Sequence, residues 1–207
     1  MKGYLISFEG IDGSGKTTQA ELLYNRICNL GYTVLLFREP GGTPVGESIR
    51  SILLDASHSD MMPLAELFLY LAARVQITSQ RIAPALDSGA FVIMDRYIDS
   101  SAAYQGHARG LGVDLVHHLN SIATGGLVPD ITFFIDCDPL TALSRISPKP
   151  DRLESEGLVF MERVRDGFRG LCQSFKDRFV LVDGNRAVKE IEETVFFEIS
   201  KRGLLHT

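Results

Sequence analysis

Residues 10–17 read GIDGSGKT and combine three glycines with an acid, a lysine and a threonine. This is the P-loop pattern, in which glycines at positive φ bring backbone N–H groups close to phosphate oxygens, and the following helix N-terminus favours the same negative charge. Lys16 would reach the β- and γ-phosphates, and the hydroxyl of Thr17 would ligate Mg²⁺. The segment therefore predicts a binding site for a nucleoside triphosphate with Mg²⁺, against the alternative of an ordinary glycine-rich turn.

Two arginines follow two of the apolar runs of the chain. Arg38 precedes the segment EPGGTP, and Arg96 lies between Asp95 and Tyr97. Transfer of a phosphoryl group needs cations for the acceptor phosphate and for the charge of the transition state. Arg38 and Arg96 are therefore candidate catalytic residues. Asp95 is either a helix N-cap or part of the Mg²⁺ site, and both interpretations stay open.

Tyr70 and Arg74 are spaced for one face of a helix, because residues four apart are neighbours on its surface. An aromatic ring that stacks on a base, one turn before a guanidinium that hydrogen-bonds its edge, would make a compact nucleobase reader. Arg50 stands on another predicted helix and could flank the same pocket. Taken alone, Arg50 and Arg74 would more often be surface residues, so their place in a pocket depends on the wider pattern.

Short apolar runs alternate with longer helical patterns along the chain. The runs are nearly apolar throughout, which is typical of parallel strands covered on both faces. This alternation predicts an α/β, doubly wound, five-stranded parallel sheet, and the order 2-3-1-4-5 would bring the second and third strands beside the P-loop. The predicted strands are residues 4–8, 33–37, 91–95, 131–136 and 179–183. The predicted helices begin near residue 16 and continue with residues 63–86, 113–124, 140–146, 158–175 and 188–202, and the segments 39–47 and 147–157 are expected to be loops.

The composition excludes several classes of protein. Of 207 residues, 45% are hydrophobic and 23% charged, as in ordinary globular proteins. The formal net charge is −5 and no segment is strongly basic, which argues against a general nucleic-acid binder. Three dispersed cysteines and the histidines at 107, 117 and 118 lack metal-ligand spacing. No run resembles a signal peptide or reaches membrane length, so a cytoplasmic protein without membrane or nucleic-acid partners is expected.

The P-loop alone leaves the class of nucleotide-binding protein open. The guanine-binding Asn-Lys-x-Asp pattern of GTPases is missing, and no Asp-x-x-Gly follows a later strand. The chain is also too short for the second half of a large motor ATPase. A small kinase that transfers the γ-phosphoryl group to a second substrate remains. The alternatives are a kinase for another nucleotide, a nucleoside or a metabolite, and a nucleotide-binding module without catalysis.

Five segments resemble thymidylate kinases in their order and spacing. They are FEGIDGSGKTTQ, REPGGTPVGESIR, LFLYLAARVQ, DRYIDSSAAYQG and DRLESEG, and the resemblance covers nearly the whole chain. It implies a bacterial-type dTMP kinase with the P-loop kinase fold, a single nucleoside monophosphate kinase domain over residues 1–207. Such an enzyme transfers a phosphoryl group from Mg·ATP to dTMP by direct in-line attack, giving dTDP and ADP. The resemblance also implies a homodimer, commonly formed through helices such as residues 63–86 and 113–124.

The same resemblance assigns roles in an acceptor site. Arg38 and Arg96 would bind the acceptor phosphate, and Asp12 would lie near the sugar 3′-hydroxyl or the Mg²⁺ shell. Tyr70 would stack on thymine, and Arg74 would donate to its O4 edge. The remaining predicted contacts are Ser101 and Gln105 at the other base edge, Pro40 and Arg50 along the pocket wall, and Tyr104 against the sugar 2′ position.

The resemblance further implies that the catalytic cation lies outside the P-loop. Some members of the family have an arginine at the position of Gly13, whereas members with glycine there place basic residues in a lid. The lid corresponds to residues 145–157 and is short in this chain. We expect Lys149 or Arg152 to close onto the phosphates and Arg145 to pack on adenine. The residues expected to bind ATP are Gly10, Ile11, Asp12, Gly13, Ser14, Gly15, Lys16, Thr17, Thr18 and Arg145.

Overall fold

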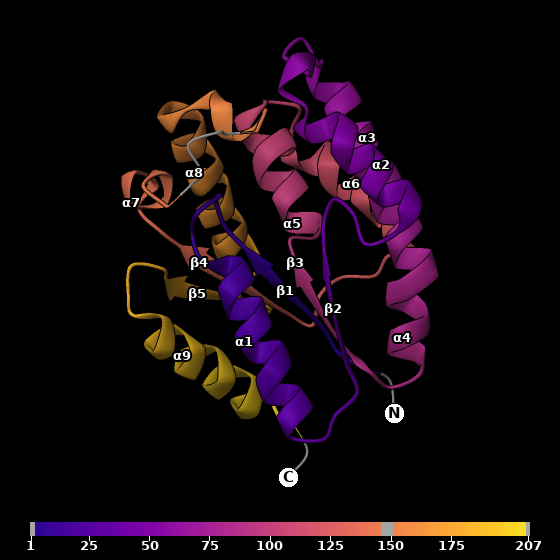
Figure 1. Ribbon diagram of the computed structural model, residues 1–207, viewed down its shortest axis with the longest axis vertical. Coiled ribbons are helices and arrows are strands. Elements are labelled where there is room, and N and C mark those ends of the chain that lie inside the picture. The colour runs from indigo at the N-terminus through magenta and orange to yellow at the C-terminus, as the bar shows by residue number, and fades with distance from the viewer. Residues whose placement is uncertain (1–2, 146–150, 206–207) are drawn as a thin grey trace.

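The predicted apolar runs form a parallel sheet. The computed structural model describes residues 3–145 and 151–205. The strands in these ranges are β1 (Leu5–Glu9), β2 (Val34–Arg38), β3 (Phe91–Asp95), β4 (Ile131–Asp136) and β5 (Phe179–Asp183). They pair in the order β2-β3-β1-β4-β5, so the predicted topology is confirmed (Figure 1). β1 is central, with Ser7 paired to Met94 of β3 and Thr132 of β4.

Helices cover both faces of this sheet. They are α1 (Lys16–Asn29), α2 (Pro44–Leu54), α3 (Pro63–Ile77), α4 (Ala83–Asp87), α5 (Ile98–Ser101), α6 (Val113–Thr124), α7 (Pro139–Leu143), α8 (Leu158–Ser174) and α9 (Val188–Lys201). Figure 1 shows α1 and α9 together over one face of the sheet. Ile6 and Phe8 of β1 pack toward these two helices, whereas Leu5 packs on the opposite side with Ile77 and Leu86. Because both faces are covered, the strand needs an apolar residue at nearly every position.

Two helices continue into π-helical turns. The predicted helix over residues 63–86 consists of α3, the π-helical segment η2 (Thr78–Ile82) and α4. A second π-helical segment, η3 (Ala102–Ala108), follows α5 and was not predicted from the sequence. π-turns inside helices are frequent at functional sites. Here η3 carries Tyr104 and Gln105 to the wall of a cleft.

The structure corrects one predicted loop. The segment 39–47 was expected to be a loop, but α2 begins at Pro44. Thr43 is its N-cap, with the side-chain oxygen accepting from the backbone N–H of Gly46 at 3.0 Å, and proline is well tolerated at the first helical position. Of the predicted loop 147–157, the described part contains the 3₁₀ turn η4 (Glu154–Glu156). None of the helices in the described ranges combines the length and the apolarity needed to span a bilayer.

Candidate active site

The P-loop connects the central strand to α1. Gly13 and Gly15 adopt positive φ angles of 77° and 95°, which a glycine permits without steric cost. A side chain at Gly13 would overlap the carbonyl oxygen of Ala142 in α7, so the close approach of α7 requires glycine at this position. Lys16 starts α1 and its Nζ donates to the carbonyl oxygen of Ile11 at 3.3 Å. The loop therefore has the backbone conformation and the lysine that a triphosphate site needs.

Arg96 joins the P-loop to the end of β3. Its φ of 69° is unusual for a residue other than glycine, and such backbone strain is concentrated at functional sites. The guanidinium donates to the carbonyl oxygen of Gly10 at 3.0 Å and to Oδ1 of Asp12 at 2.6 Å. The hydroxyl of Tyr104 donates to the other carboxylate oxygen of Asp12 at 3.1 Å. Arg96 is thereby held at the mouth of the loop.

The charge state of Asp12 follows from two neighbouring cations. Burial by itself raises the pKa of the carboxyl, but Arg96 and Lys16 outweigh this effect and hold the pKa of Asp12 well below its usual range. The Nζ of Lys16 lies 3.6 Å from Oδ1 of Asp12. Asp12 is therefore ionised at neutral pH and keeps two like charges near each other.

Thr17 and Asp95 form a candidate site for Mg²⁺. The Thr17 hydroxyl donates to Oδ2 of Asp95 at 2.6 Å, while Oδ1 of Asp95 is buried and has no hydrogen-bond partner in the described part of the chain. α5 begins after Tyr97 without a side-chain cap, so the N-cap interpretation of Asp95 finds no support. The described ranges contain no cluster of three or more His, Cys, Asp or Glu side chains suited to a metal. Mg²⁺ is usually held by one or two protein groups together with phosphates and water, and Thr17 and Asp95 could supply these protein groups.

A cleft that is partly open to solvent lies beside Asp12 and Arg96, and charged, polar and aromatic side chains line it. Eight of the nine residues predicted to bind the acceptor line it: Pro40, Arg50, Tyr70, Arg74, Arg96, Ser101, Tyr104 and Gln105.

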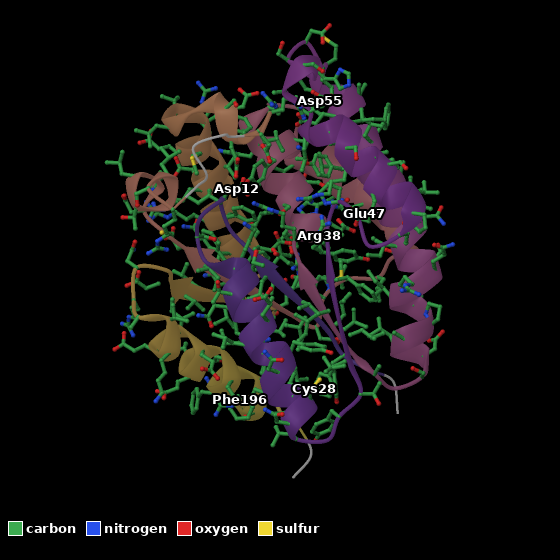
Figure 2. The ribbon with its side chains drawn as sticks, in the orientation of Figure 1. Asp12, Cys28, Arg38, Glu47, Asp55 and Phe196 are labelled. Carbon is green, nitrogen blue, oxygen red and sulfur yellow. The ribbon has the colours of Figure 1, made fainter. Side chains whose placement is uncertain are left out.

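The ninth predicted residue, Arg38, lies in a neighbouring groove with Thr17 and Asp95. Its guanidinium pairs with Glu47 at 3.1 Å, and Figure 2 shows these two side chains side by side. About half of the Arg38 side chain is exposed, so the pair is easily exchanged for another anion.

Arg74 was predicted to donate to a base, but in the structure its side chain is buried and engaged by other residues of the protein. It is only 1% exposed, and all five of its N–H groups are engaged. Nε and Nη2 donate to Glu39 at 2.9 and 2.6 Å, and Nη2 also donates to the carbonyl oxygen of Tyr97 at 3.1 Å. Nη1 donates to Ser101 at 2.8 Å and to Asn120 at 2.6 Å. Arg74 would have to exchange one of these bonds before it could donate to a base.

Glu9 is a buried acid that the sequence analysis did not single out. It accepts from the backbone N–H of Tyr97 at 2.8 Å and from the Ser100 hydroxyl at 2.5 Å. Burial, together with the charge of Asp99, raises the pKa of Glu9 to about 7. Glu9 thus shapes the turn after Arg96, and Ser100 in turn accepts from Arg96 at 3.1 Å.

The three cations predicted for the lid have different outcomes. Arg145 lies beside the P-loop, where its Nη1 donates to the carbonyl oxygen of Gly13 at 3.3 Å. Lys149 lies outside the described residues. Arg152 is buried, and its Nε donates to the carbonyl oxygen of Leu53 at 2.8 Å. Arg152 therefore contacts the end of α2 and the buried carboxylate of Glu66 in α3, and its role at the phosphates stays a prediction.

Several functional side chains were missed because their partners are distant in sequence. Glu39 and Asp151 line the cleft, and Glu39 pairs with an arginine 35 residues away. Local spacing carries no signal for such a pair. A buried arginine requires an anionic partner, but the sequence gives no sign that Arg74 is buried, because an arginine on a helix is more often a surface residue.

The phosphate-binding loop and the cleft meet at Asp12 and Arg96, so two ligands could lie on either side of these side chains. This is the arrangement of a small P-loop kinase, in which a phosphate donor and an acceptor meet across a few side chains. The family model described as thymidylate kinase matches residues 8–195. The chain belongs to the thymidylate kinase family.

Similar proteins extend over nearly the whole chain. The thymidylate kinase of Caldanaerobacter subterraneus subsp. tengcongensis is 49% identical over 196 residues, which are 94% of this chain and 94% of that protein. The thymidylate kinase of Geobacter sp. strain M21 is 47% identical and covers 91% of this chain, with 87% of its own length. The crystal structure of thymidylate kinase from Ehrlichia chaffeensis superposes with a TM-score of 0.80 at 33% identity, covering 97% of this chain and 99% of that one.

Proposed function

We propose that this chain phosphorylates dTMP to dTDP with ATP and Mg²⁺, by direct in-line transfer, in the synthesis of dTTP. Its membership of the thymidylate kinase family supports the reaction. The observation that carries the proposal is the cleft, which meets the P-loop at Asp12 and Arg96, so that an acceptor phosphate and a donor phosphate can share the same cations. We propose further that residues 1–207 form one kinase domain with a lid at about residues 145–157.

The residues of the chain would act by position and charge, since no covalent enzyme intermediate is needed. Bound Mg²⁺ would neutralise phosphate charge and would be held near Thr17 and Asp95. Lys16 would hold the donor phosphates, and Arg96 would exchange part of its contact with Asp12 for phosphate oxygens. Arg38 would bind the acceptor phosphate in the same way, by releasing Glu47.

Recognition of the acceptor would depend on the walls of the cleft. Tyr70 is half-buried there and offers a ring for stacking on thymine. Tyr104 is fixed by Asp12 and would occupy the space of a ribose 2′-hydroxyl, which favours a deoxynucleotide. Ser101 and Gln105 would contact the base edge, with Arg74 joining them if it gives up one of its present bonds.

The charge of the transferred group requires a cation close to the P-loop. The sequence offers Lys149 and Arg152 in the lid, and the structure adds Arg145 beside Gly13. Arg152 is held by its hydrogen bond to the end of α2. Lys149 and Arg145 are therefore the better candidates for this role.

A homodimer that acts in the cytoplasm completes the proposal. Large apolar side chains are exposed on α3 and α6, which are the helices expected to form the interface. They include Phe68 at 53% and Ile122 at 67% exposure. Single exposed apolar residues are common, but several on adjacent helices favour a protein partner such as a second copy.

A coupled assay of ADP release tests the proposal. The purified chain is supplied with Mg·ATP and, in separate reactions, with dTMP, dUMP, dCMP, AMP and thymidine. We expect the highest kcat/KM with dTMP. A preference for thymidine or for another nucleotide would indicate a different small kinase, and no turnover with any acceptor would indicate a nucleotide-binding module.

A further inference from the structure

A second charged cluster lies at the wall of the cleft and is built around Glu66 of α3. The Glu66 side chain is 0% exposed. Its carboxylate accepts from Nε2 of Gln105 at 2.8 Å and from Nη2 of Arg109 at 3.3 Å. Nη2 of Arg152 lies 2.6 Å from Oε2 of Glu66, in a contact that is an ion pair without the alignment of a hydrogen bond. Three segments that are distant in sequence therefore meet at one buried carboxylate.

Arg152 also ties its own segment to the end of α2. Its Nε donates to the carbonyl oxygen of Leu53 at 2.8 Å, and its backbone N–H donates to the carbonyl oxygen of Leu54 at 3.3 Å. The residues on either side of it, Asp151 and Leu153, line the acceptor cleft. Arg152 thus points toward Glu66 while its neighbours contribute to the cleft wall.

The turn that contains Arg152, residues 151–154, is closed by hydrogen bonds of its own. Oδ1 of Asp151 accepts from the backbone N–H groups of Leu153 and Glu154, both at 2.9 Å. The backbone N–H of Asp151 donates to the Glu154 side chain at 2.9 Å, which closes the turn from the other side. Because these bonds fix the shape of residues 151–154, the position of the whole turn depends on what Arg152 holds.

Glu66 also determines the orientation of Gln105. An ionised carboxylate can only accept hydrogen bonds, so the amide nitrogen of Gln105 must face Glu66. Gln105 lines the cleft, and its amide oxygen is the end left to accept from a donor group of a ligand. The same carboxylate therefore sets one polar contact of the cleft and the position of one of its walls.

We propose that Arg152 is a positioning residue, which acts through its pairing with Glu66 to hold residues 151–153 against the acceptor cleft, and that it is not the catalytic cation of the lid. The proposal rests on the proposed function of the cleft as the dTMP site. The Arg152 side chain is 5% exposed, and moving it to the phosphates would leave a fully buried carboxylate with Arg109 and Gln105 alone. Breaking a buried ion pair in this way is strongly unfavourable.

The test is the kinetics of Arg152→Met, a change that keeps much of the side-chain volume and removes the charge. We expect KM for dTMP to rise by about tenfold or more, while kcat stays within about threefold and KM for ATP within about twofold of the wild type. Arg152→Lys keeps the charge and loses the geometry at Leu53, so it should restore part of the affinity for dTMP. Glu66→Gln should raise KM for dTMP in the same direction.

Glu156→Gln is the matched control. Glu156 is partly exposed and pairs with Arg109 at 2.5 Å, so its neutralisation leaves the contacts between Glu66 and Arg152 in place. Its kinetic constants should equal those of the wild type. Circular dichroism of each variant verifies that it is folded. If Arg152→Met does not fold, the kinetic constants of Arg152→Lys are compared with those of the wild type.

Two results would overturn the proposal. A fall in kcat of tenfold or more at unchanged KM for dTMP would make Arg152 a catalytic cation, and unchanged constants would show that it has neither role. If the wild type itself prefers another acceptor, the proposed function fails instead. The same comparison of KM and kcat is then made with that acceptor and still decides the role of Arg152.

Discussion

Two carboxylates in this protein each hold two cations, and they differ in access to the cleft. Asp12 lies between Arg96 and Lys16 and keeps 29% of its side chain exposed. Glu66 lies between Arg152 and Arg109 and is 0% exposed. The same combination of charges can therefore serve opposite purposes. The two cations at Asp12 can exchange this carboxylate for a phosphate at the surface of the cleft. Glu66, in contrast, can only hold its two arginines in place.

The physical reason is the cost of separating charges inside a protein. A buried carboxylate that loses its cation is neither hydrated nor paired, whereas a carboxylate in a cleft regains water when its cation turns away. Asp12 also keeps Arg96 and Lys16 close together before substrate arrives, because it offsets their mutual repulsion. When phosphates bind, they can take over this role. We therefore expect changes at the Asp12 cluster to alter catalysis, and changes at the Glu66 cluster to alter stability and the shape of the acceptor site.

The largest effect is expected for Lys16→Met. This change removes a cation from the Asp12 cluster, and catalytic efficiency should fall by about 10³-fold, the scale of losing a preorganised group that stabilises transition-state charge. The free energy of unfolding should hardly change, because a poorly hydrated charge is removed along with its ion pair. Steady-state ADP release and chemical denaturation measure the two quantities. Lys189→Met, at an exposed position of α9, is the control and should change neither.

Glu66→Gln tests the other cluster through stability. It leaves Arg152 buried opposite a neutral amide, so the free energy of unfolding should fall by about 3 kcal/mol, as for other buried pairs that lose one partner. Urea denaturation followed by circular dichroism measures the change. The exposed variant Glu156→Gln should stay within about 1 kcal/mol of the wild type. Equal stability of Glu66→Gln and the wild type would contradict the distinction between the two clusters.

Asp12→Asn should have a smaller effect than Glu66→Gln, and the effect should be mainly on catalysis and less on stability. The amide keeps the shape of the side chain but no longer offsets the repulsion between Arg96 and Lys16, so both should lie less well placed for phosphate. We expect kcat to fall by about tenfold, in line with a displacement of catalytic groups. Stability should also fall, but by less than in Glu66→Gln, because the ion pairs of Asp12 are partly open to water. A loss of stability as large as that of Glu66→Gln would show that Asp12 has a mainly structural role.

Glu9 is a third carboxylate to compare with Asp12 and Glu66. It is buried, and its hydrogen-bond donors are neutral groups and not cations. The pKa of Glu9 rises from its ordinary value of 4.5 to about 7, opposite to the direction at Asp12. Between these pH values the unfolded chain carries an ionised Glu9, while the folded chain keeps the proton. Folding then takes up a proton, and stability falls as the pH increases through this window. Below 4.5 and above about 7 both states bind the same number of protons, and the contribution of Glu9 no longer changes.

Thermal unfolding as a function of pH measures this contribution. The melting temperature of Glu9→Gln should fall by a few degrees less than that of the wild type between about pH 5 and pH 7.5, because the amide does not titrate. The exposed variant Glu193→Gln should follow the wild-type curve. Identical slopes for Glu9→Gln and the wild type would show that Glu9 does not titrate in this window.

Some elements could not be predicted for identifiable physical reasons. Residues 98–108 are buried on nearly all sides and rich in small side chains, so they show no amphipathic period and their helical turns were missed. Pro44 was interpreted as part of a loop, although a proline after a threonine also fits the start of a helix, as α2 shows. The π-helical turns depend on packing that local patterns do not describe.

The sequence by itself determined the parts of the protein that follow from local chemistry. The glycines and Lys16 define the P-loop, and continuous apolar runs define parallel strands. Tertiary structure alone decided which cations are available. Arg96 is paired with Asp12, which keeps 29% of its side chain exposed, whereas Arg74 and Arg152 are paired with the buried carboxylates of Glu39 and Glu66. The reason is that an arginine looks the same in any sequence, and its function depends on whether the folded chain surrounds it with a buried carboxylate or leaves it open to a ligand.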